Sequence, residues 1–147
     1  MQTLLIAIGN TLRRDDGVGH RVLELLGPMP EVRVRRLQQL TPETAAELPG
    51  AGRVIFVDAD AEGGEVRIEP LPASGGRVTP IGHAIRPPEI VVLSEKLYGF
   101  RGAAFLCRIP ARDFSEGETL SPETEGNAAT AARLLRAFLR QSNSASL

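Results

Sequence analysis

The chain has 147 residues, 42% of them hydrophobic, and a formal net charge of −1. This length suits one domain with a single sizeable core, and the balanced charge gives no field that would attract nucleic acid or an anionic membrane. The single cysteine, Cys107, excludes an internal disulfide framework and an all-cysteine zinc site. It also favours a reducing, cytoplasmic location. The first apolar run stops at Gly9, too short for a signal peptide or a membrane span, so we expect neither.

The first half of the chain reads as alternating strands and helices. Continuous apolar runs predict strands that are buried on both faces, and apolar residues at helical spacing predict helices. In chain order we expect a buried strand at 3–8, a helix at 16–26, an exposed strand at 31–37, a short helix at 41–48 and a buried strand at 53–59.

The second half continues the pattern after a turn and a loop that is rich in proline and glycine. We expect an antiparallel edge strand within 62–71, a loop at 72–82, a helix at 86–99, a strand at 102–110 and a helix at 121–140. One domain would then cover residues 1–141, and residues 142–147 would form a frayed tail. We see no internal repeat and no linker.

Strands that alternate with helices predict an α/β fold with a mostly parallel sheet and helices on both faces. Ligands of such sheets bind beyond the carboxyl ends of the strands. Asp15 and Asp16 follow the first expected strand, Asp58 and Asp60 end the third, and His83 closes the long loop. We therefore expect these side chains to converge at one edge of the sheet.

Two carboxylates and an imidazole are good ligands for a borderline divalent metal such as nickel or zinc. Three protein ligands also leave coordination positions open for water or a substrate. Spacing alone leaves a second interpretation open, in which the aspartates cap helices or turns and the histidine lies on the surface. Asp15 and Asp60 fit capping or supporting roles better than ligand roles.

A phosphate-binding loop is the third interpretation, and it fits the residues less well. A dinucleotide fingerprint needs Gly-x-Gly-x-x-Gly directly after the strand. Here Gly9 is followed by Asn10, two arginines and two aspartates before Gly17. Two carboxylates at the start of the helix would repel a pyrophosphate.

Three further groups of residues suggest structural roles. His20 lies off the apolar stripe of its helix, so we expect it to be solvated. Arg33, Arg35 and Arg36 form a basic strand face that suits a protected sheet edge. Cys107 lies in an apolar run and is expected in the core.

Four stretches of the sequence, in order, resemble the hydrogenase maturation endopeptidases. That family opens with a strand, a Gly-x-Gly-Asn variant and an Asp-Asp/Glu-x-x-Gly helix start. Its later motifs are an aspartate that ends a buried strand, a histidine shortly before a helix, and Leu-Ser-Pro before the last helix. The matching stretches here are "IAIGNTLRRDDGVGHRVLELL", "VIFVDAD", "GHAIRPPEIVVLSEKLYG" and "GETLSPETEGNAATAARLL".

The resemblance implies a three-layer α/β/α fold with a twisted, mostly parallel five-stranded sheet. It implies an endopeptidase, of the aspartic or metal-dependent type, that removes the C-terminal extension of a [NiFe] hydrogenase large-subunit precursor after nickel insertion. Asp16, Asp58 and His83 would recognise the nickel that the precursor holds, with zinc or cadmium as surrogates. The same three residues are the candidates for catalytic roles.

The chain departs from the family pattern at two loops. It has "LQQLTPE" after the second strand and "HAIRPPE" at the histidine, and both loops are expected to face the substrate. Two alternatives stay open: a maturation chaperone or checkpoint with the same metal site that does not cleave, and a small nucleotide- or phosphate-binding protein.

Overall fold

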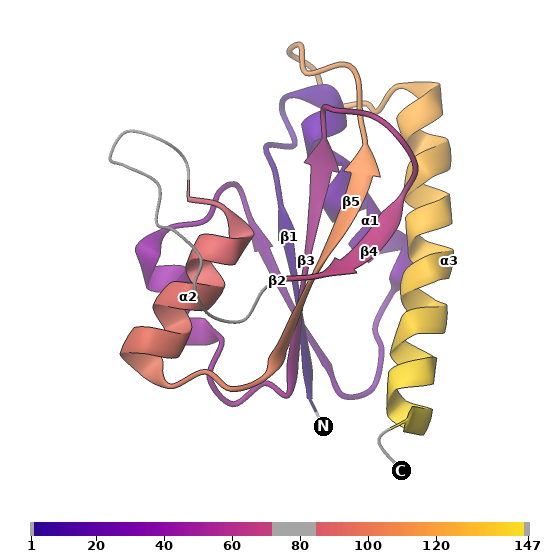
Figure 1. Ribbon diagram of the computed structural model, residues 1–147. Helices are drawn as coiled ribbons and strands as arrows, with labels where there is room; N and C mark the ends of the chain where they lie inside the picture. The colour runs from indigo at the N-terminus through magenta and orange to yellow at the C-terminus, as the bar shows by residue number, and fades with distance from the viewer. Residues whose placement is uncertain (1, 72–84, 146–147) are drawn as a thin grey trace.

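The computed structural model describes residues 2–71 and 85–145, and Figure 1 shows a twisted sheet with helices on both faces. The strands are β1 Thr3–Ile8, β2 Val32–Leu37, β3 Arg53–Asp60, β4 Arg67–Pro70 and β5 Ala103–Pro110. The α-helices are α1 Val18–Leu26, α2 Pro87–Tyr98 and α3 Pro122–Ala145, and the 3-10 helices are η1 Arg14–Gly17 and η2 Pro42–Glu47.

The five strands lie in the order β2-β1-β3-β5-β4. Neighbouring strands are parallel except at the edge, where β4 runs antiparallel to β5. This arrangement confirms the expected α/β fold with a mostly parallel five-stranded sheet, including the short antiparallel edge strand.

Two apolar cores hold the layers together. Leu5 and Ile55 point into the core under α1 and α3, whereas Leu4 and Phe56 point into the core under η2 and α2. Successive side chains of a strand face opposite sides of the sheet. A strand between two cores therefore needs apolar residues at every position, which explains the unbroken run in β1.

The observed bounds refine several expected elements. The helix expected at 16–26 starts as the 3-10 turn η1, and the one expected at 41–48 is entirely 3-10 with Thr41 as its N-cap. Strand β3 continues to Asp60. The last turn of α3 overlaps the tail expected from residue 142, and the loop expected at 72–82 lies outside the described residues. No helix in the described ranges is long and apolar enough to cross a membrane.

Candidate functional site

The carboxyl ends of β1 and β3 form the switch point of the sheet. From β1 the chain passes through α1 to β2, and from β2 it passes through η2 to β3 on the opposite side of β1. The connecting helices pack on opposite faces of the sheet. Chain segments that leave toward opposite faces open a crevice beyond the strand ends, where α/β proteins bind ligands.

A cavity of about 240 Å³ lies at this switch point, and both Asp16 and Asp58 line it. Its remaining walls come from the ends of β1 and β2 and from the start of α2. They are Ile8, Gly9, Gln38, Gln39, Leu40, Ile85, Arg86 and Pro87. The two loops expected to face a substrate, after β2 and before α2, therefore both contribute to this cavity.

The carboxylate of Asp16 is held by the turn that ends β1. Its Oδ2 accepts a hydrogen bond of 2.7 Å from the backbone N–H of Asn10. Gly9 makes this close approach possible, because a Cβ at that position would lie 1.9 Å from the carbonyl oxygen of Asp16 and the residue has φ +150°. No described residue donates to Asp16 Oδ1, so that oxygen is available to a ligand.

A second glycine sets the distance between α1 and the end of β3. A Cβ at Gly19 would lie 2.6 Å from the carbonyl oxygen of Val57, the residue that precedes Asp58. The helix can pack this closely on the strand only because the position has no side chain. Gly9 and Gly19 together bring the two carboxylates to one cavity.

The carboxyl group of Asp58 is partly buried, and its Oδ1 accepts a 2.8 Å hydrogen bond from the N–H of Ala59. Burial raises the pKa of Asp58, and the negative charges of Asp16 and Asp60 raise it further. The Ala59 N–H and the positive charge of Arg108 lower it, and the net pKa is about 7. A divalent cation placed between Asp16 and Asp58 would relieve this repulsion and favour the ionised form.

The structure brings together two of the three residues expected to bind metal. Within residues 2–71 and 85–145, no group of three or more His, Cys, Asp or Glu side chains is arranged to hold a metal ion. His83 lies outside the described residues. Ile85, which follows it by two positions, lines the cavity.

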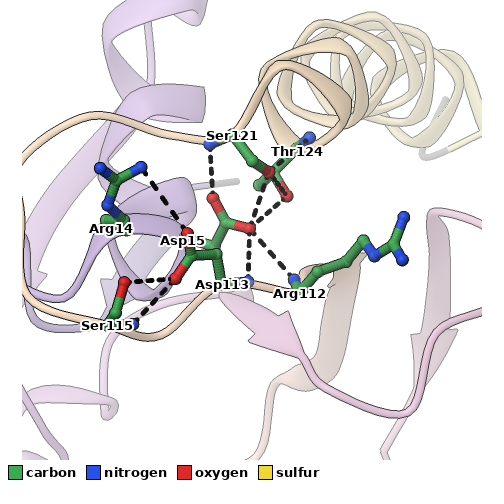
Figure 2. A network of polar contacts seen from close by, with 7 residues as sticks. All are labelled: Arg14, Asp15, Arg112, Asp113, Ser115, Ser121 and Thr124. Atoms are coloured by element: carbon green, nitrogen blue, oxygen red, sulfur yellow. Dashed lines mark hydrogen bonds and ion pairs between the residues drawn. The ribbon is translucent and has the colours of Figure 1, made fainter.

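Asp15 supports the structure of this region from the interior of the protein. It has no exposed surface, and Figure 2 shows that it joins η1 to the loop between β5 and α3. Its carboxylate accepts five hydrogen bonds of 2.8–3.1 Å, which come from the backbone N–H groups of Arg112, Asp113 and Ser121 and from the hydroxyls of Ser121 and Thr124. Of the two roles expected from the sequence, a cap or a supporting group, Asp15 has the supporting one.

The bonds to Asp15 also determine its ionisation. Burial on its own raises the pKa of this carboxyl group. The backbone donors at Asp113, Ser121 and Arg112 and the Thr124 hydroxyl outweigh that effect and lower the pKa to about 2. Asp15 is therefore a fixed negative charge that positions η1, and through it the neighbouring Asp16.

Two other polar residues near the cavity have defined contacts. Asp60 is buried, accepts the N–H of Glu62 at 3.0 Å and pairs with Arg108 at 3.8 Å, which fits the supporting role expected from the sequence. His20, which was expected to be solvated, is half-buried and lines a hollow in the surface. Its Nε2 lies 2.8 Å from the carbonyl oxygen of Gly9, so it holds the same turn that orients Asp16.

A larger hollow of about 590 Å³ lies beside α1 and the loop before α3. Its principal charges pair with one another, because Arg21 forms ion pairs with Glu24 and Glu125. The smaller cavity at the switch point is the better candidate site, because two carboxylates line it and neither forms an ion pair with a described residue within 4 Å.

Comparison with known proteins identifies solved structures with a similar fold. No family model and no curated protein matches the chain. Among solved structures, the chain is similar to the hydrogenase maturating endopeptidase HybD from E. coli, with TM-score 0.70 and 19% identity over 97% of this chain and 94% of that one.

Two archaeal structures are similar to the same extent. One is the [NiFe] hydrogenase maturation protease HycI from Thermococcus kodakarensis, with TM-score 0.68 and 25% identity over 95% of this chain and 92% of that one. The other is a hydrogenase 2 maturation peptidase from a Thaumarchaeota archaeon, with TM-score 0.69 and 23% identity over 95% and 98%. These matches confirm the resemblance carried by the sequence motifs, and they show that the chain has the fold of these proteins.

Proposed function

We propose that this protein is an endopeptidase that removes the C-terminal extension of a [NiFe] hydrogenase large-subunit precursor once nickel has been inserted. One observation carries the proposal: the two carboxylates that match the family motifs, Asp16 and Asp58, line one cavity at the switch point of the sheet. The names of the similar structures, which are hydrogenase maturation proteases, supply the reaction class.

The chemistry of the donor set suits nickel that a substrate presents. Asp16 Oδ1 and Asp58 Oδ2 receive no hydrogen bond from the described residues, whereas the second oxygen of each carboxylate is held by a backbone N–H. Each side chain can therefore offer one oriented oxygen. A site with few protein ligands leaves coordination positions for groups of the precursor, so it can test whether the precursor holds its metal.

We propose His83 as the third ligand because of its position in the sequence. It stands two residues before Ile85, which lines the cavity, and two peptide units span at most about 7.6 Å. This short spacing in the sequence is our reason for including His83 in the proposed site. Asp16, Asp58 and His83 would then supply two oxygens and one nitrogen, a set that suits nickel and accepts zinc or cadmium in its place.

Intact-mass spectrometry of the precursor tests the proposal. The large-subunit precursor of the same host is incubated with the protein in two forms, with nickel loaded and without nickel. The proposal predicts that only the loaded form loses a discrete C-terminal peptide, and that the Asp58→Ala variant leaves the loaded form intact.

The other outcomes identify the alternatives. Binding of the loaded precursor without any change of mass would contradict the endopeptidase proposal and favour a non-cleaving checkpoint protein. Neither cleavage nor binding would mean that the fold is shared but the partner is not. Binding of a phosphate ligand at this cavity that survives Asp16→Ala would favour the phosphate-binding alternative.

A further inference from the structure

A buried arginine lies at the opposite edge of the sheet from the candidate site. Arg53 is the first residue of β3 and is only 4% exposed. Asp58 lies five positions further along the same strand, a distance of about 16 Å. Arginine is almost never buried to this extent without a carboxylate partner, because removing its charge from water is costly.

The described residues satisfy only part of this guanidinium group. Its Nε donates a 2.8 Å hydrogen bond to Thr3 Oγ1, and its Cζ lies 5.6 Å from the centre of the Phe138 ring. Within the described part of the chain, no carboxylate forms an ion pair with Arg53, and the buried Nη1 has no hydrogen-bond partner. The Arg53 guanidinium group therefore has N–H donors without an acceptor among the described residues.

A cavity of about 180 Å³ lies against this arginine. A second cation, the exposed Arg140 of α3, lines the same cavity, and it too forms no ion pair with any described residue. The other lining residues are Thr3, Met29, Pro30, Glu31, Val32 and Leu139. The cavity is wide enough for several water molecules, each of which occupies about 30 Å³ in the liquid.

We propose that the cavity formed by Arg53 and Arg140 binds a small oxyanion, either a free phosphate or a carboxylate. A guanidinium group offers parallel N–H donors that match the oxygens of both groups, and such bonds are strongest where water is excluded. Burial lowers the pKa of Arg53, which is the effect expected of a cation without a counter-ion, and arginine stays charged at neutral pH. The site is independent of the proposed peptidase function.

Glu31 is the one carboxylate on the cavity wall, and it makes the proposal testable. Its side chain is exposed, and it forms no ion pair with Arg53 or Arg140 in the described structure. If the cavity binds an anion, Glu31 repels that anion and Glu31→Gln strengthens binding. If Glu31 is instead the natural counter-ion of Arg53, Glu31→Gln destabilises the protein and creates no stronger anion site.

The experiment measures thermal unfolding and isothermal calorimetry with inorganic phosphate and, in a separate arm, with acetate, each against chloride at equal ionic strength. We expect at least one anion to raise the melting temperature of the wild-type protein. Arg53→Met keeps the packing against Phe138 and should abolish the rise, and Arg140→Gln should weaken binding by about tenfold. A response to phosphate alone, or to acetate alone, identifies the source of the oxyanion.

Two results would overturn the proposal. One is the absence of any anion-specific rise with either probe, and the other is an equal rise in wild type and in Arg53→Met. If Arg53→Met does not fold, the comparison rests on the two surface variants. Arg140→Gln and Glu31→Gln must then change the anion affinity in opposite directions, and identical affinities in both would overturn the proposal.

Discussion

Replacing Asp15 with asparagine tests the structural role of the buried carboxylate most sharply. The side chain keeps its shape, but one acceptor oxygen becomes an amide donor. Oδ1 of Asp15 faces the N–H of Ser121, and Oδ2 faces the N–H groups of Arg112 and Asp113 (Figure 2). Whichever way the amide turns, at least one backbone donor meets another donor and stays unpaired.

The magnitude follows from the pKa of Asp15, which is about 2 in the folded protein against 3.8 for the unperturbed group. A carboxyl whose pKa falls on folding stabilises the native state by roughly 1.4 kcal/mol per unit of pKa shift, which gives about 2 kcal/mol here. An unpaired buried donor costs a further 1–3 kcal/mol or so. We expect Asp15→Asn to lower the free energy of unfolding at pH 7 by about 3–5 kcal/mol.

The dependence on pH distinguishes the charge from the geometry. Because the folded pKa is the lower one, the ionic contribution is complete above pH ~5 and is lost as the pH falls toward 2. Urea unfolding followed by circular dichroism at several pH values should therefore show the wild type approaching the variant in acid. Asp113→Asn supplies the control: this side chain is 39% exposed, pairs with Arg14 at 3.6 Å and, among the described residues, accepts hydrogen bonds only from Ser115. Because Asp113 is less buried than Asp15, its substitution should have a smaller effect. A loss under 1 kcal/mol for Asp15→Asn, or one that is the same at every pH, would refute this reasoning.

Further predictions concern Asp58, two glycines and the cysteine. The pKa of Asp58 rises to about 7 on folding, so the native state loses stability as the pH rises from about 4 to about 7. Asp58→Asn should therefore be more stable than the wild type at pH 8 by about 2–4 kcal/mol. The same urea titrations should show no gain below pH 4. Gly9→Ala should lower the melting temperature and weaken nickel binding, because the Cβ of the new alanine collides with the carbonyl oxygen of Asp16. At Gly126 of α3 an added Cβ meets no atom within 4 Å, so Gly126→Ala should instead stabilise the protein by about 0.5–1 kcal/mol. Burial raises the pKa of the Cys107 thiol to about 12, so iodoacetamide should leave the native protein unmodified and label the protein fully in urea, as mass spectrometry would show.

The periodic features of the sequence were sufficient to predict the layers of the fold. The unbroken apolar runs of β1 and β3 predict strands between two cores, and proline before an apolar stripe predicts the starts of α2 and α3. Strand ends follow from the same pattern, which is why Asp16 and Asp58 were expected at one edge of the sheet. Their shared cavity agrees with that expectation.

Contacts between residues that lie far apart in the sequence could not be predicted from local sequence patterns. The residues that donate hydrogen bonds to Asp15 lie 97 to 109 positions away in the sequence, so its sequence neighbours indicate only a helix start. Similarly, His20 is polar and off the apolar stripe, and nothing nearby in the sequence indicates that it reaches the Gly9 carbonyl. The positions of Gln38 and Arg86 on the cavity wall depend on how the loops after β2 and before α2 meet. The nickel-binding role of His83 stays a prediction.

The most direct test of the candidate site is the nickel affinity of the purified protein, measured by calorimetry for the wild type and for Asp16→Ala, Asp58→Ala and His83→Ala. Asp113→Ala serves as a carboxylate control away from the cavity. If the three residues share one ion, each substitution removes a ligand and should weaken binding by about tenfold or more, with the control unchanged. Nickel affinity that is the same in all five proteins would contradict the proposed site.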